Sequence, residues 1–276
     1  MQYEDYRYLT FERRANGVVL ITIDRPERKN AANERLHDEF AEVWRTIGRD
    51  PEARVAVVTG RGSAFSAGGD LKEHGTPEES LRSDRVLRSG QVALDIVNNM
   101  LNLDKPIVSA INGVAVGAGL AIALTADISI IDEDVRITDG HSRIGVSSGD
   151  HAVMLWPWMC GMAKSKYYLL TADFLSGAEA ERIGLVSKAV PSDRVLDEAF
   201  KVADRLGLGP QRALRSTKRS LNHVLRSAAP AFELSVALET IDFYQEDALE
   251  GLRAFHEKRA PQFPSAGETP VGEATN

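Results

Sequence analysis

The first half of the chain alternates short β-rich runs with amphipathic segments, and this alternation constrains the fold more than any other feature. A helix is expected after Asn33, a suitable N-cap, because large apolar residues recur at helical spacing from Leu36 to Ile47. A second helix is expected over Asp84 to Leu101. Strands are expected over Tyr8 to Arg13, Gly17 to Ile23, Val55 to Thr59, Ile107 to Ile111, Ile128 to Ile131 and Val186 to Val190. The pattern predicts an α/β layer architecture with a largely buried sheet.

The last third of the chain has a different, almost wholly helical pattern. Helices are expected over Val195 to Leu206, Gln211 to Arg226, Ala231 to Tyr244 and Asp247 to Lys258. Their apolar faces have little sheet left to cover, so we expect them to pack on one another or on another subunit. The end of the chain, residues 264–276, is rich in Gly, Pro and Thr, and we expect it to be disordered.

Composition excludes several classes of protein. With 43% hydrophobic and 26% charged residues among 276, the chain is an ordinary globular one. Polar residues and glycines interrupt its longest apolar stretch, from Ile107 to Ile131, so no membrane span is expected, and the first residues lack the features of a targeting segment. The net charge of −7 argues against nucleic acid or an anionic membrane as partner. The single cysteine, Cys160, fits a reducing, cytoplasmic location.

Two glycine-rich segments, Thr59 to Asp70 and Asn112 to Leu120, each follow an expected strand. A phosphate-binding loop is excluded in the first, because no Gly-Lys-Ser/Thr follows at the required spacing. The second resembles the start of a dinucleotide fingerprint, but Ile122 stands where the third glycine belongs. A Gly-x-Ser-x-Gly pattern over residues 145–149 lacks the preceding strand and the downstream acid and histidine of a serine hydrolase.

Taken together, the two glycine-rich segments suit an oxyanion hole, in which one backbone N–H from each segment binds the oxygen of a carbonyl. The stretch from Phe65 to Glu73, with the sequence FSAGGDLKE, carries a resemblance to a known family. Further matching stretches are residues 24–31, 105–119, 126–128, 175–186 and 250–259. In this order they are similar to the enoyl-CoA hydratase/isomerase (crotonase) superfamily, and the likeness runs from about Tyr8 to Phe263.

The resemblance implies a spiral of ββα units over residues 1–195, a helical trimerisation region over 196–263, and a homotrimer or a dimer of trimers. It implies that the N–H groups of Gly69 and Ala118 form the oxyanion hole. It also implies an acyl-CoA substrate, with coenzyme A as part of the substrate and neither a separate cofactor nor a metal. The implied substrate contacts are Arg28, Asn30, Ala67, Gly68, Asp70, Leu71 and Lys72.

The chain departs from the family at two positions. Hydratases of the family hold one water between two glutamates, and those positions correspond to Ala121 and His141 here. A methyl group cannot accept a proton, so the ordinary two-glutamate hydration is in doubt. The isomerase branch, in which a single carboxylate shuttles a proton, remains open.

Asp150 is the candidate replacement, with His141 and His151 as proton-transfer partners. The local sequence around Gly149-Asp150 resembles oxocamphor hydrolase, a superfamily member that cleaves a carbon–carbon bond in a β-diketone, and in which the matching Asp is catalytic. The alternative is that Asp150 only caps the helix expected over Ala152 to Met159. A metal site built from Asp139 and these three residues is not expected, because the oxyanion hole already supplies an electrophile.

Three hypotheses therefore remain. The first is an acyl-CoA enzyme that stabilises a thioester enolate and performs hydration, isomerisation or carbon–carbon cleavage. The second is a hydrolase of free β-diketones, and the third is a non-enzymatic member that uses the fold for assembly. The acyl group is not identified, because Met154, Trp156, Trp158 and Met159 fit a hydrophobic core as well as an acyl pocket.

Overall fold

The computed structural model describes residues 1–73 and 75–267. Its larger sheet has six strands in the order β1-β2-β3-β5-β7-β10. Strand β1 is antiparallel to β2, and the other neighbours are parallel. The strands are β1 (Leu9–Arg13), β2 (Val18–Ile23), β3 (Val55–Gly60), β5 (Ile107–Ile111), β7 (Ile128–Asp132) and β10 (Lys188–Val190). All six expected strands are therefore present, although β10 begins two residues later than predicted.

A second, four-stranded sheet has the order β4-β6-β8-β9. Its strands are β4 (Ala64–Ser66), β6 (Val114–Ala115), β8 (Arg136–Ile137) and β9 (Leu175–Ser176). The sequence analysis missed all four, because two or three residues are too few to show an alternating pattern. Three of them directly follow a strand of the larger sheet along the chain, which gives the repeated β–β–helix order.

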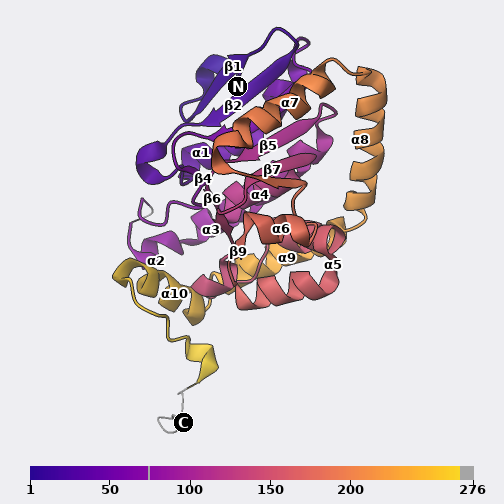
Figure 1. The fold of residues 1–276 in the computed structure, drawn as a ribbon. Coiled ribbons are helices and arrows are strands. Elements are labelled where there is room, and N and C mark those ends of the chain that lie inside the picture. Colours follow the sequence, from indigo (N-terminus) through magenta and orange to yellow (C-terminus); the bar gives the residue numbers. More distant parts are fainter. Residues whose placement is uncertain (74, 268–276) are drawn as a thin grey trace.

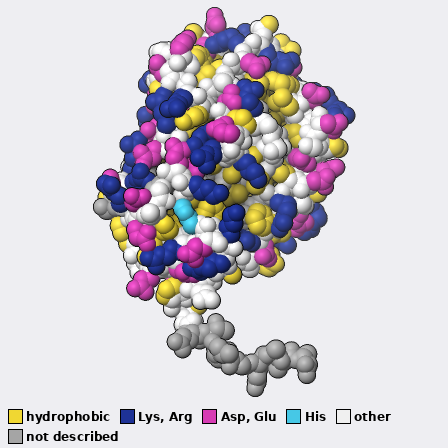
Figure 2. All heavy atoms as spheres, turned by 90° about the vertical axis from the view of Figure 1, so that its left-hand side faces the viewer, with side chains coloured by type: hydrophobic (Ala, Val, Ile, Leu, Met, Phe, Trp, Pro, Cys, Tyr) yellow, Lys and Arg dark blue, Asp and Glu magenta, His cyan; other side chains and the backbone are white. Residues whose placement is uncertain are grey.

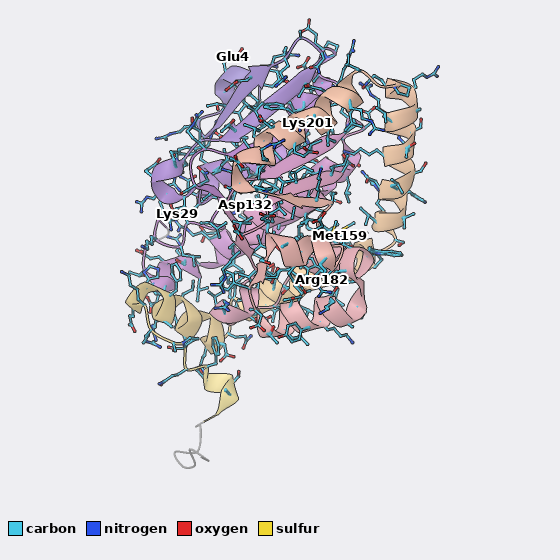
Figure 3. The ribbon with its side chains drawn as sticks, viewed as in Figure 1. Glu4, Lys29, Asp132, Met159, Arg182 and Lys201 are labelled. Atoms are coloured by element: carbon cyan, nitrogen blue, oxygen red, sulfur yellow. The ribbon has the colours of Figure 1, made fainter. Side chains whose placement is uncertain are left out.

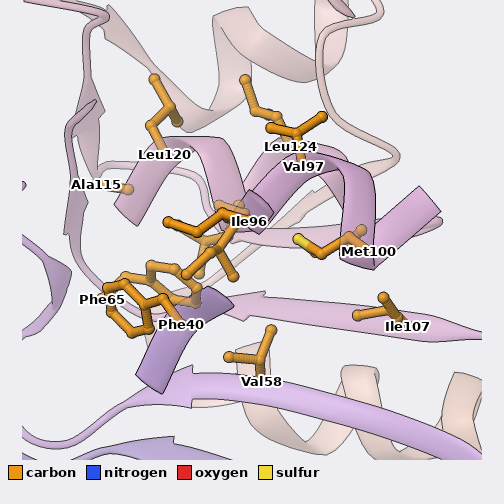
Figure 4. Close-up of a cluster of buried hydrophobic side chains, with 14 of the residues drawn as sticks. Phe40, Val58, Phe65, Ile96, Val97, Met100, Ile107, Ala115, Leu120 and Leu124 are labelled. Atoms are coloured by element: carbon orange, nitrogen blue, oxygen red, sulfur yellow. The ribbon is translucent and has the colours of Figure 1, made fainter. Parts of the chain in front are cut away.

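Helices cover both faces of the larger sheet (Figure 1). On one face lie α1 (Glu34–Arg49), α3 (Ser83–Asn102) and α4 (Gly117–Thr125), which share the main core with Val58, Phe65 and Ile107 (Figure 4). On the other face α7 (Val195–Gly207) packs through alanines and valines. Asn33 caps α1 as expected, since its side chain accepts a hydrogen bond from the Leu36 N–H at 3.0 Å.

The remaining helices lie outside these two layers. They are α2 (Pro77–Ser80), α5 (Ala152–Thr171), α6 (Gly177–Arg182), α8 (Gln211–Arg226), α9 (Ala229–Asp242) and α10 (Glu246–Glu257). Helix α5 runs past the predicted end at Met159 and kinks at Gly161, whose φ of 77° is not helical. The kink interrupts the helical pattern in the sequence.

The two helices before the C-terminus fold back onto their own chain. Helix α9 contacts α3 and α5, and α10 contacts α2 and the 3₁₀ turn η3 (His141–Ile144). Of the expected disordered tail, Pro264–Ala266 form a short 3₁₀ turn, and residues 268–276 lie outside the described part. Among the described helices, none combines the length and hydropathy needed to cross a membrane.

Candidate active site

A cavity of about 380 Å³ lies where both glycine-rich segments meet α3, α9 and α10. Its walls include the two residues predicted for the oxyanion hole and three ionisable side chains. These five are Gly69, Ala118, His141, Asp150 and Glu239. Four of the five were predicted from the sequence, and they come from segments far apart in the chain.

The N–H groups of Gly69 and Ala118 are available to a ligand. Among the described residues, none accepts a hydrogen bond from either group. Ala118 lies in the first turn of α4, where N–H groups have no partner within the helix. The close approach of α4 to β4 requires Gly119, because a Cβ there would lie 2.4 Å from the Cβ of Ser66. The arrangement is suited to binding a carbonyl oxygen.

His141 lies at the centre of a buried cluster of carboxyl groups. Its Nδ1 is 2.9 Å from Oδ2 of Asp139, which also accepts a hydrogen bond from the Ser148 hydroxyl at 2.6 Å. Its Nε2 is 3.3 Å from Oε1 of Glu239 and 3.9 Å from Oδ2 of Asp150. The imidazole therefore links three carboxyl groups from three separate segments.

The cluster divides into groups with opposite pKa shifts. Burial alone lowers the pKa of His141, but the charges of Asp139, Asp150 and Glu239 outweigh it and raise that pKa well above its usual value. Burial raises the pKa of Asp150, yet the charges of His151 and His141 bring it below the ordinary value. The pKa of Glu239 is raised, chiefly by burial and also by its acidic neighbours. At neutral pH the site thus pairs an ionised Asp150 with a Glu239 that retains its proton more readily, which is how acid and base roles are separated.

Asp150 does not cap the helix that follows it. The N-cap of α5 is His151, and no side chain forms a cap hydrogen bond there. The Asp150 carboxylate instead accepts a hydrogen bond from Nδ1 of the fully buried His151 at 2.5 Å. The capping alternative is therefore wrong, because the carboxylate is engaged with the two histidines and lines the cavity.

Comparison with known proteins agrees with this geometry. Residues 13–266 match the family model described as Enoyl-CoA hydratase/isomerase. The chain belongs to the enoyl-CoA hydratase/isomerase family. A 1,2-epoxyphenylacetyl-CoA isomerase of Escherichia coli is 30% identical over 90% of this chain and 95% of its own. An (E)-benzylidenesuccinyl-CoA hydratase of Thauera aromatica is 32% identical over 91% of this chain and 97% of its own.

The fold is likewise that of the crotonase superfamily. The crystal structure of an enoyl-CoA hydratase/isomerase from Mycobacterium paratuberculosis has a TM-score of 0.84 and 31% identity. It covers 90% of this chain and 99% of its own. An enoyl CoA isomerase from M. smegmatis has a TM-score of 0.67 and 28% identity over 83% of this chain and 98% of its own.

Within this family fold, Glu239 is the site residue that the sequence analysis missed. It lies on α9, which docks against the loop before α5. The Ser235 hydroxyl donates to the Gly149 carbonyl at 3.1 Å, and a Cβ on Gly149 would lie 2.2 Å from Oε2 of Glu239. A signal was available, since Glu239 follows the buried Phe232 and Val236 at helical spacing on the inward face of α9.

The predicted substrate contacts fall into three groups, namely cavity-lining residues, buried polar residues and exposed cations. Ala67, Gly68 and Leu71 line the cavity. The side chains of Asn30 and Asp70 are buried and serve the protein itself. The Asn30 amide donates to the Ala64 carbonyl at 2.7 Å, and the Asp70 carboxylate pairs with Arg25 at 2.6 Å.

Both predicted cations, Arg28 and Lys72, are exposed and stand outside the cavity walls. The side of the molecule that carries α2 and α10 nevertheless has many Lys and Arg side chains around hydrophobic ones (Figure 2). Roles in coenzyme A binding stay predictions for Arg28 and Lys72, as they do for Asn30 and Asp70.

The other residues that the sequence analysis named differ in where the structure places them. Ala121 lines the cavity at the position where family hydratases carry a glutamate. Met154 and Trp156 are buried in the core, Trp158 is exposed, and Met159, on α5 (Figure 3), stands outside the cavity walls.

Ligand-type atoms of Asp139, Asp150 and His151 lie within 4.8 Å of one another and could hold a metal ion, but both carboxylates already bond to histidines.

Proposed function

We propose that this family member binds an acyl-CoA thioester and stabilises the enolate formed next to its carbonyl group. The N–H groups of Gly69 and Ala118 bind the thioester oxygen, where the negative charge develops. The observation that carries the proposal is the cavity itself, whose walls hold Gly69 and Ala118 together with one carboxyl group of lowered pKa, Asp150, and one of raised pKa, Glu239.

Each ionisable group has a distinct role. Asp150 is the base that removes a proton from the substrate or from water, because its pKa is low and its carboxylate lines the cavity. Glu239 supplies the proton that the product needs. His141 is a fixed cation between them, since an imidazole that holds its own proton cannot act as a base. Asp139 and Ser148 set its orientation.

To determine the reaction type, the pure protein is incubated with saturated, enoyl and β-keto CoA thioesters, and the products are identified by mass spectrometry and NMR. A product that has gained the mass of one water molecule and whose acyl chain is intact indicates hydration. A product of unchanged mass whose double bond has shifted, as seen by NMR, indicates isomerisation, and a carboxylic acid together with a shortened CoA thioester indicates carbon–carbon cleavage. If none of these thioesters is changed or bound, the proposal is wrong.

Hydrolysis of a carbon–carbon bond in a β-diketone or β-keto acyl-CoA is the second candidate. It is favoured by the His141 cluster, because one acid and one base on the same wall provide for both water attack and protonation of the leaving carbon. The position of Arg28 and Lys72 outside the cavity walls also suits a substrate without phosphates. Turnover of a free diketone without any thioester would favour this candidate.

A trimer, or a dimer of trimers, is the assembly we propose for the working enzyme. Support comes from large apolar side chains that are exposed on α5, α8 and α9 of the single chain.

The cytoplasm is the location we propose, because Cys160 is a free cysteine that forms no disulfide.

A further inference from the structure

Arg143 and Phe174 stand together on the wall of the active-site cavity. The Nε of Arg143 donates to the Ala172 carbonyl at 2.9 Å, and its guanidinium carbon lies 4.7 Å from the centre of the Phe174 ring. Arg136, from β8, places its guanidinium carbon 4.5 Å from the centre of the same ring. Two arginines are thus gathered on one aromatic side chain.

Arg143 and Arg136 differ from the two other arginines of the cavity wall, Arg85 and Arg88, although Arg136 itself stands outside that wall. Arg85 pairs with Glu34 at 3.3 Å, and Arg88 pairs with Asp38 at 2.6 Å. Within residues 1–73 and 75–267, no carboxylate lies within ion-pair distance of Arg143 or Arg136. Both are exposed, so they keep most of their hydration and their charge without a protein counterion.

We propose that Arg143, supported by Arg136 and Phe174, is a subsite for an oxyanion of the substrate. A guanidinium held by its Nε and by an aromatic face still presents its two terminal NH₂ groups, which match the oxygens of a phosphate or a carboxylate. Because stacking has already fixed the side chain, little further conformational freedom is lost when an anion binds.

The position of Arg143 fits a group at the rim of the cavity. It shares the turn η3 with His141, but His141 is buried whereas Arg143 is exposed. A substrate with its reacting carbon beside His141 would therefore present a more distant group to Arg143. In the proposed function, on which this inference rests, that group is a phosphate of coenzyme A or a carboxylate at the end of the acyl group.

The test compares the wild type with Arg143→Gln and Arg136→Gln. Arg253→Gln is the matched control, because Arg253 is also an exposed arginine, pairs with Glu78 and stands outside the cavity walls. Three probes are measured by calorimetry and ligand-observed NMR. Free coenzyme A carries phosphates, glutaryl-N-acetylcysteamine carries a carboxylate alone, and butyryl-N-acetylcysteamine is neutral.

We expect Arg143→Gln to weaken binding of one anionic probe about tenfold, the usual size for one lost charge-assisted hydrogen bond, and to leave the neutral probe unchanged. Arg136→Gln should have a smaller effect on the same probe. Loss confined to coenzyme A identifies a phosphate as the oxyanion, and loss confined to the glutaryl thioester identifies a carboxylate.

Unchanged binding of both anionic probes, or equal weakening of all three, would overturn the inference while leaving the proposed function intact. If the wild type itself binds neither coenzyme A nor the thioesters, the proposed acyl-CoA function fails together with the subsite.

Discussion

His141 occupies a position at which family hydratases carry a glutamate, and its surroundings convert it into a cation. Asp139, Asp150 and Glu239 face it from the loop after β8, the segment before α5, and α9. The three carboxyl groups outweigh the burial that would otherwise neutralise the imidazole. A change at one of these residues should therefore alter proton affinity at the others.

Replacing Asp150 with Asn should lower turnover by a hundredfold or more, because the amide cannot accept the proton that general base catalysis transfers. Binding of coenzyme A thioesters should be retained, since the oxyanion N–H groups are unchanged. Steady-state kinetics and calorimetry measure the two effects. Asp134→Asn, at an exposed position outside the cavity walls, is the control, and a fully active Asp150→Asn would exclude Asp150 as the base.

Replacing Asp139 with Asn should bring the pKa of His141 down toward its usual value of about 6.5, because the nearest negative charge is removed. The measurement is the pH dependence of the His141 ring signals by NMR, which requires no substrate. Ser148→Ala, which removes a hydrogen bond but no charge, should shift that pKa much less. A wild-type His141 that titrates near pH 6.5 would contradict the charge assignment.

The free energy of unfolding should depend on pH through the same two groups, His141 and Asp139. His141 binds its proton more tightly in the folded state, so its contribution is full below about pH 6.5 and is lost as the pH rises through the folded-state pKa. The pKa of Asp139 is lowered in the folded state because the attraction of His141 outweighs burial, so its contribution is full above about pH 4 and is lost in more acidic solution. Urea denaturation from pH 3 to 10 should show the alkaline loss at lower pH in Asp139→Asn than in the wild type.

Among the elements, α4 and α9 contribute most to the site. Helix α4 brings the Ala118 N–H to the cavity because Gly119 lets it lie against β4. Helix α9 brings Glu239 because Gly149 lets it lie against the loop before α5. In both cases a glycine, which has no side chain, allows two elements to approach each other closely.

Substituting Ala for Gly149 should therefore separate α9 from the loop. The new Cβ would lie 2.2 Å from the Glu239 carboxylate and 2.8 Å from the Ser235 carbonyl, so we expect a loss of about 1–3 kcal/mol in the free energy of unfolding. Turnover should fall with it. Gly48→Ala is the control, since the exposed Gly48 in α1 has space for a methyl group and Ala favours a helix by about 1 kcal/mol. Equal stability of the two variants by chemical denaturation would contradict this account.

At the scale of the whole molecule, large apolar side chains remain exposed on two helices that contact each other, α5 and α9. Leu170 on α5 is 77% exposed and Leu234 on α9 is 59% exposed, and Trp158 and Ile241 lie on the same two helices. Exposure of this extent on neighbouring helices supports the proposed assembly of several copies of the chain. Of the late helices expected to have little sheet to cover, α9 carries part of this exposed surface, whereas α7 covers the larger sheet, so the expectation was wrong for α7.

Light scattering after size exclusion should give three or six times the 30.2 kDa mass of one chain. Leu170→Glu combined with Leu234→Glu should shift the protein toward the monomer, because each places a charge in an apolar contact. Arg45→Glu, on the exposed face of α1, should leave the mass unchanged. A wild-type monomer at micromolar concentration would exclude the proposed assembly.

The sequence by itself determined the six strands of the larger sheet, the helices α1, α3 and α7 to α10, and the positions of Gly69, Ala118, His141 and Asp150. The strands and helices depend on local patterns, namely the spacing of apolar residues. The four site positions were implied by the resemblance to the enoyl-CoA hydratase/isomerase family. Only the tertiary structure decided the place of Glu239 on the cavity wall, the opposite pKa shifts of Asp150 and Glu239, and the gathering of Arg136 and Arg143 on Phe174. Those properties arise from burial and from distances between segments that are remote in the chain, which no local pattern contains.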